Sequence, residues 1–153
     1  MAVESYKSQM ILRNIKIVDL AGNSCRALDA DREYVIIVST EAIKETLNVT
    51  VGWVIKNAEG LSIYGTSTAV QGKLFDYEAG EIKETRFSFK PRLALGTYYL
   101  SGGVAETLTP EDEIMNYVMK DYVHDALSFV VGSDIDSGIA KMTSTLVSFQ
   151  KVD

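Results

Sequence analysis

Few residues in this sequence are of the kinds on which catalysis and metal binding usually depend. Among 153 residues there is one histidine, His124, and one cysteine, Cys25. A single histidine excludes metal sites with several histidine ligands and most histidine-based catalytic triads. A single cysteine excludes an intrachain disulfide and fits a reducing compartment. Cys25 lies in turn-like sequence without a companion that would activate it, so we interpret it as incidental, and His124 as structural or solvated.

Motifs that mark other protein classes are also missing. No apolar run approaches the length of a membrane span, and the N-terminus carries no secretory signal. Neither a phosphate-binding G-x-x-x-x-G-K-[ST] loop nor a G-x-S-x-G nucleophile elbow occurs. The formal charge of −6, from 15 basic and 21 acidic residues, argues against nucleic acid as a partner.

Carboxylates are plentiful, but their spacing singles out no pair that would be held across a glycosidic bond. Asp134 and Asp136 precede Gly138, and such a turn could hold calcium. Asp and Gly are ordinary turn residues, however, so the sequence predicts no metal site, no catalytic residue and no cofactor.

The clearest structural signal is the segment 48–68, NVTVGWVIKNAEGLSIYGTST. In its first half, apolar residues alternate with others in the period of a half-buried strand. Residues 57–60 supply turn chemistry, with Gly60 free to take positive φ. The segment predicts a β-hairpin with Tyr64 and Thr66 on the outer face of its second strand. The predicted core residues of its first strand are Val49, Val51, Trp53 and Ile55.

Similar alternation, or a β-branched run, occurs along most of the chain. The predicted strands cover 10–20, 25–28, 34–40, the two arms of 48–68, 81–90, 97–104, 125–131 and 139–152. Residues 105–124 are predicted as a loop with one or two helical turns beginning at Thr109 and Pro110. The predicted fold is all-β, an immunoglobulin-like or jelly-roll antiparallel β-sandwich of about eight strands. Residues 1–9 are expected to be a flexible N-terminal segment, and 10–153 a single domain.

The outer face of this sandwich carries the candidate binding residues. A tyrosine ring can cover the apolar face of a sugar while its hydroxyl bonds a sugar hydroxyl, and the chain has eight tyrosines. Small residues such as Gly52 predict a shallow trough, and an outward row on 81–90 offers positive charge to a carboxylate or phosphate. The predicted carbohydrate-binding residues are Tyr64, Thr66, Tyr99, Ser101, Ser128 and Arg86. On spacing alone, a plain solvated sheet face explains the same residues.

Three segments resemble one family of carbohydrate-binding domains. VGWVIKNAEGLSIYGTST (51–68) is similar to that family's hairpin, VGF-x-I-x-(N/D)-x-x-G-x-x-(I/V)-(F/Y)-G-T-(N/S)-T. FSFKPRLALGTYYLSGGVA (87–105) looks like its strand–turn–strand, and DYVHDALSFVVGSDIDSGIAKM (121–142) like its closing segment. The family is the C-terminal domain of the ATP-binding subunit in ABC transporters that export O-antigen polysaccharide (the Wzt type). The likeness covers about 11–152, and it departs from the pattern at Trp53, where phenylalanine is usual, and at the basic residues 90–92.

The resemblance implies a function as well as a fold. Such domains form homodimers, partly by exchanging a terminal strand, and bind the non-reducing terminus of a lipid-linked O-antigen polysaccharide without catalysis. The implied partners are that glycan, a second copy, and the ATPase domain and membrane subunit of the transporter. The implied location is cytoplasmic, at the inner face of the inner membrane. Since no ATP-binding motif is present, we expect an excised recognition domain whose Met1 is an introduced start.

Two other functions stay open from the residues themselves. A structural or protein-interaction sandwich would dock a partner chain on its outer sheet face. A glycan-acting enzyme would need two carboxylates that face one cleft.

Overall fold

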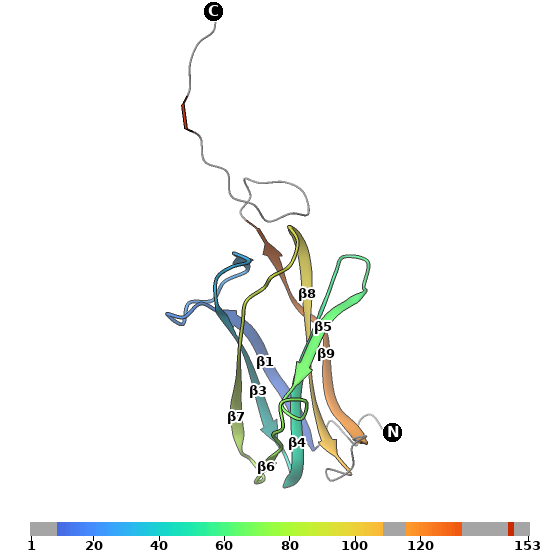
Figure 1. Cartoon of the computed structure of the whole chain (residues 1–153). Helices are drawn as coiled ribbons and strands as arrows, with labels where there is room; N and C mark the ends of the chain where they lie inside the picture. Colours follow the sequence, from blue (N-terminus) through green and yellow to red (C-terminus); the bar gives the residue numbers. More distant parts are fainter. Residues whose placement is uncertain (1–8, 109–115, 133–146, 149–153) are drawn as a thin grey trace, which may run out of the picture.

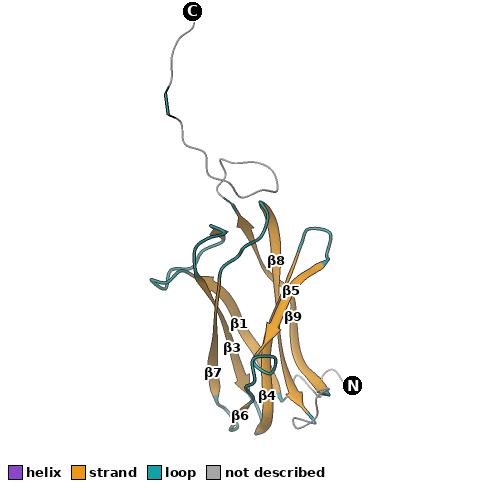
Figure 2. Ribbon diagram, in the orientation of Figure 1, coloured by secondary structure: helices purple, strands orange, loops and turns teal. Residues whose placement is uncertain are grey.

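The computed structural model describes residues 9–108, 116–132 and 147–148. Within these residues the chain forms strands joined by turns and loops, and Figure 2 shows no helix among them. The strands are β1 (Met10–Val18), β2 (Ala27–Leu28), β3 (Tyr34–Ala42), β4 (Thr46–Lys56), β5 (Ser62–Ser67), β6 (Phe75–Tyr77), β7 (Ile82–Phe89), β8 (Gly96–Thr107) and β9 (Tyr117–Val131). The predicted all-β class is confirmed.

The strands form two sheets that face each other (Figure 1). The smaller sheet has three strands in the order β1-β3-β7. The larger has six, in the order β2-β9-β8-β4-β5, with β6 paired to β4. Its pairings are antiparallel except for the short β2–β9 pair. This is the predicted β-sandwich, and no further layer of described strands covers the outer face of the six-stranded sheet.

Apolar side chains from both sheets meet between them. Along β4, the predicted core residues Val49, Val51, Trp53 and Ile55 are at most 3 % exposed. The Trp53 ring meets Phe87 of the other sheet edge-on, with centroids 5.9 Å apart and planes at 82°. Burial stabilises the fold by about 2 kcal/mol for each large apolar side chain. It also determines which face of β4 is left outside.

The second strand of the hairpin has the opposite phase from the prediction. The predicted turn forms, and Gly60 has a φ of 83°. A register shift beside Ile55 then pairs Tyr64 with Ile55 and Thr66 with Trp53. Residues paired directly across two strands share a face, so the prediction that Tyr64 is on the outer face is wrong. The prediction assumed that inward and outward side chains keep alternating after the turn. One extra residue in β5 at the shift exchanges the inward and outward positions.

Part of the predicted loop 105–124 is strand. β8 continues to Thr107 and β9 begins at Tyr117, and these two residues pair. The β8–β9 pairing contains two register shifts, and the one between Val104 and Ala105 places one extra residue in β9, which moves the side-chain alternation by one position. A period-two pattern is therefore broken in the sequence although the strand is continuous in space.

Some predictions lie outside the described residues. These are residues 1–8 of the predicted flexible segment 1–9, the helix start at Thr109 and Pro110, the two aspartates at 134 and 136, and most of the predicted last strand 139–152. In the part of the chain that the structure describes, no helix is long and apolar enough to cross a membrane.

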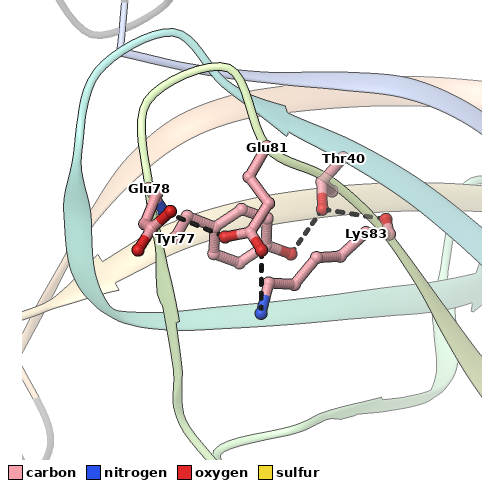
Figure 3. A network of polar contacts seen from close by, with 5 residues as sticks. All are labelled: Thr40, Tyr77, Glu78, Glu81 and Lys83. Carbon is pink, nitrogen blue, oxygen red and sulfur yellow. Dashed lines mark hydrogen bonds and ion pairs between the residues drawn. The ribbon is translucent and has the colours of Figure 1, made fainter.

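A buried polar network ties the two sheets together at one end of the sandwich (Figure 3). Tyr77 of β6 is 1 % exposed, and its hydroxyl lies 2.6 Å from Thr40 Oγ1 of β3. The Lys83 ammonium lies 5.2 Å from the centroid of the Tyr77 ring and 3.9 Å from Glu81 Oε2. Burial raises the pKa of Tyr77, and the Thr40 hydrogen bond opposes part of that effect. Because β6 pairs with β4, this network links β4 to the three-stranded sheet.

Candidate functional site

The outer face of the six-stranded sheet is hollowed where small residues meet across adjacent strands. Gly52 of β4 pairs with Gly103 of β8, and Gly65 of β5 pairs with Val54 of β4. Where a residue has no Cβ, the backbone itself forms the surface. These residues, with Ala105, form the floor of a hollow of about 600 Å³ that we call the outer trough. Its volume lies in the range of small-molecule sites.

The glycines of β8 show which face the trough occupies. A Cβ on Gly103 would lie 3.1 Å from Tyr122 Cδ2 and 3.2 Å from Met119 Sδ, side chains of the trough wall. A Cβ on the neighbouring Gly102 would instead meet two aliphatic side chains of β1, at 3.1 Å each. The trough therefore lies on the face opposite the core.

One wall comes from the first half of β9. Tyr117, Met119 and Tyr122 pair with Thr107, Ala105 and Gly103 of β8, so each large side chain stands beside a smaller residue. Tyr117 is 61 % exposed, and Met119 and Tyr122 are each 38 % exposed. The two tyrosine rings are therefore available to a ligand, and each supplies an apolar face and a hydroxyl.

The opposite wall comes from β5 and the residues after it. Thr66 and Ser67 line it, followed by Ala69 and the largely exposed Val70. The Ala69 N–H donates to Thr50 Oγ1 at 3.1 Å, which holds this segment against β4. The wall is thus attached to the same strand that supplies part of the floor.

A buried hydroxyl in the trough lining has no partner. Thr107 is 3 % exposed, and among the described residues its Oγ1 has no hydrogen bond. Buried polar atoms are normally satisfied, and leaving one unpaired costs about 1–3 kcal/mol. A ligand hydroxyl in the trough would satisfy this atom once the side chains that shield it move aside.

The trough is lined by aromatic, aliphatic and hydroxyl groups. The described residues that line it include no charged side chain and no histidine. In residues 9–108, 116–132 and 147–148, no group of three His, Cys, Asp or Glu side chains could hold a metal ion. Burial raises the pKa of the Cys25 thiol, with a smaller effect of the Asp19 charge in the same direction, and a raised pKa disfavours the reactive thiolate.

A pair of basic side chains stands next to the trough. Lys56 Nζ lies 3.1 Å from His124 Nδ1 and 3.4 Å from its Nε2. Lys56 belongs to β4 and His124 to β9, so the pair reaches across β8, which lies between them. The ring of His124 also contacts that of Tyr122, with centroids 5.7 Å apart. Tyr122 thus joins the basic pair to the trough wall.

The match to a known family covers most of the chain. The sequence profile of the Wzt C-terminal domain matches residues 4–142. The chain belongs to the Wzt C-terminal domain family. Membership confirms the resemblance predicted from the three segments and gives the chain a carbohydrate-binding role in O-antigen transport by an ABC transporter.

One solved structure shares the fold. The crystal structure of the C-terminal domain of wzt matches with a TM-score of 0.72 at 20 % identity, covering 92 % of this chain and 84 % of that chain. The CARDB domain of the PF1109 protein from Pyrococcus furiosus matches at 16 % identity and a TM-score of 0.43, covering 81 % and 94 %. A β-glucosidase, EmGH1 from Erythrobacter marinus, matches at 9 % identity and 0.46, covering 80 % and 15 %. No curated protein sequence matches the chain.

In this Wzt C-terminal domain, the predicted site residues lie in five places. Thr66 lines the trough although it pairs with Trp53, and its hydroxyl accepts a hydrogen bond from Gln71 Nε2 at 3.2 Å. Tyr64 is 57 % exposed but packs on the Trp53 ring, with centroids 5.7 Å apart, on the core side of β5. Ser101 is fully buried, and its Oγ accepts a hydrogen bond from the Asp125 N–H at 2.9 Å. Ser101 is therefore occupied in holding the irregular part of β9.

Tyr99 and Ser128 pair with each other, and Tyr99 also pairs with Lys56. They therefore share the outer face with the basic pair, beyond the residues that line the trough. Arg86 belongs to β7, in the other sheet, and its guanidinium donates to Glu84 Oε1 at 3.1 Å. The structure brings Tyr99 and Ser128 together and leaves Arg86 apart from both.

The sequence reasoning missed the wall of β9. Tyr117, Met119 and Tyr122 fall in the segment predicted as a loop. Tyr117 and Met119 do show strand spacing, but the change of phase before Tyr122 hides the continuation. The register shift opposite Ala105 produces that change.

Proposed function

We propose that this chain binds the non-reducing terminus of a lipid-linked O-antigen polysaccharide in the outer trough. In this role it selects finished chains for export by the transporter, and it catalyses no reaction. The observation that carries the proposal is a trough with a glycine floor, a wall on β9 that carries two tyrosine rings, and a buried hydroxyl that has no hydrogen-bond partner among the described residues. Sugars present apolar C–H faces and hydroxyl groups, which such a surface matches.

Isothermal titration with O-polysaccharides that differ in their terminal residue tests the proposal. We expect saturable binding to at least one terminus, and no binding to the same polymer with that terminus removed. Tyr117→Ala should weaken binding about fivefold to tenfold, because a stacked ring contributes on the order of 1–1.5 kcal/mol. Tyr64→Ala is the matched control, since its ring is similarly exposed, at 57 % against 61 %, but lies outside the trough.

Weak binding by Tyr64→Ala with normal binding by Tyr117→Ala would move the site out of the trough to the surface around Tyr64. Absence of heat with every polysaccharide tested would overturn the proposed function itself.

Thr107→Val distinguishes binding from folding, because it should keep or raise stability while it lowers glycan affinity. Valine is nearly the same size, and the change removes a buried hydroxyl that has no partner among the described residues. The free energy of unfolding should therefore stay the same or rise by about 1 kcal/mol, while glycan affinity falls. A loss of both stability and affinity would show that Thr107 acts through the fold.

We further propose that the chain acts as a homodimer, with a strand-exchanged dimer as one form, beside the ATPase domain and membrane subunit at the inner face of the inner membrane. Two sites on one dimer would bind neighbouring glycan termini with higher avidity than one site. Light scattering coupled to gel filtration measures the dimer directly. A monomer at all concentrations would contradict it without affecting the glycan site.

A further inference from the structure

The Lys56–His124 pair lies on the surface of the sheet, and no carboxylate of the described residues neutralises its positive charge. Both side chains lie on the outer face, with Lys56 partly exposed and His124 exposed. Among the described residues, no carboxylate forms an ion pair with Lys56. The exposed Asp125 follows His124 in β9, but it makes no ion pair with Lys56 or His124 in the described part of the chain. The ammonium group is therefore held by an imidazole and left without a counter-charge.

The surroundings of the pair are polar and lead into the trough. Tyr122 lines the trough and touches the ring of His124. Tyr99 of β8 and Ser128 of β9 share the same face beside Lys56, and both carry hydroxyls. A ligand that lay across the trough toward this end would meet a cation, an imidazole and hydroxyl donors in succession.

We propose that Lys56 and His124 form a subsite for an acidic group, a carboxylate or a phosphate, on the sugar that occupies the outer trough. The proposal rests on the proposed function, and it adds that the preferred glycan terminus is anionic. The trough lining supplies no charge of its own, so this pair would account for that preference. A lysine ammonium and an imidazole N–H both donate to an anion, and charge-assisted hydrogen bonds are the stronger kind.

The test compares O-polysaccharides that end in a neutral sugar, a uronic acid or a sugar phosphate, by isothermal titration. We expect the acidic termini to bind about threefold to tenfold more tightly than the neutral one, with a preference that weakens as salt is added. Lys56→Met and His124→Gln should each remove most of this preference and leave neutral termini unaffected. Lys90→Met removes one positive charge beyond β7 in the other sheet, and should change nothing.

Free glucuronate and glucose 6-phosphate, used as competitors beside glucose, identify the acid. Stronger competition by one of them assigns the carboxylate or the phosphate. Equal affinity for neutral and acidic termini, or an acidic preference that Lys56→Met and His124→Gln leave intact, would overturn the subsite and leave the trough in place. Competition by inorganic phosphate alone, equal to that by glucose 6-phosphate, would also overturn it, because the site would then bind an ion and not a sugar. Failure of every polysaccharide to bind would overturn both proposals together.

Discussion

Two glycine-to-alanine substitutions in β8, one on each face of the sheet, should affect glycan binding and folding separately. Gly102 and Gly103 are neighbours, and their missing side chains would point to opposite faces of the sheet. An alanine Cβ at Gly103 would lie 3.1 Å from Tyr122 and 3.2 Å from Met119, both 38 % exposed. At Gly102 it would lie 3.1 Å from buried side chains of β1. The first change therefore fills the trough, and the second overfills the core.

The two substitutions should differ in both measured quantities. Alanine in place of glycine within a strand gains about 0.5–1 kcal/mol of stability. Overpacking a core costs about 1–3 kcal/mol. The net result is a loss of about 1 kcal/mol for Gly102→Ala, or about 3 °C in Tm, and little change for Gly103→Ala. An extra methyl group in a fitted pocket changes affinity by about 1–3 kcal/mol, so Gly103→Ala should bind glycan about tenfold to a hundredfold more weakly.

Thermal unfolding followed by circular dichroism gives the stability, and isothermal titration gives the affinity. Both variants are titrated at a temperature where they are fully folded. Normal affinity in Gly103→Ala would show that the glycan does not lie over the floor of the trough. An equal loss of affinity in Gly102→Ala would show that binding responds to the core and not to the trough surface.

Two further predictions concern the stability of the sandwich. Tyr77→Phe should lower the free energy of unfolding by about 1 kcal/mol near neutral pH, because Thr40 loses its closest partner but stays within 3.5 Å of the Lys83 carbonyl. Burial raises the pKa of Tyr77 above its ordinary value of 10.0, so the unfolded state loses the phenol proton at a lower pH than the folded state. The free energy of unfolding therefore falls as pH rises above about 10. Tyr77→Phe should reduce that fall, as measured by urea denaturation at a series of pH values. Asp121→Ala should cost about 2 kcal/mol in urea denaturation, because the Leu12 N–H, which donates to Asp121 Oδ2 at 2.9 Å, loses its partner. Asp121→Asn, which keeps an acceptor, should cost less, and an equal cost would contradict this reasoning.

Local patterns in the sequence were sufficient for the class of fold and for one face of the central strand. The alternation from Val49 to Ile55 requires only that successive side chains of a strand point to opposite sides. The turn before Gly60 likewise depends on neighbouring residues alone. The resemblance to the Wzt C-terminal domain also rests on contiguous segments, and the family match bears it out.

The walls of the trough could not be predicted in the same way. Tyr64 was expected beside the trough, but a register shift after the turn places it on the core side of β5. Tyr122 was assigned to a loop, but a register shift in the β8–β9 pairing brings it opposite Gly103. A shift of one residue moves every later side chain to the other face, and it depends on how two strands pair.

The sequence by itself determined a chain of amphipathic strands with a glycine in β4 that opens the outer face, because these properties follow from residue order within each strand. Only the tertiary structure decided which rings stand beside that opening, that the buried Thr107 hydroxyl has no hydrogen-bond partner in the described part of the chain, and that Lys56 meets His124 across β8. These features join residues far apart in the chain, and strand order and register set their distances.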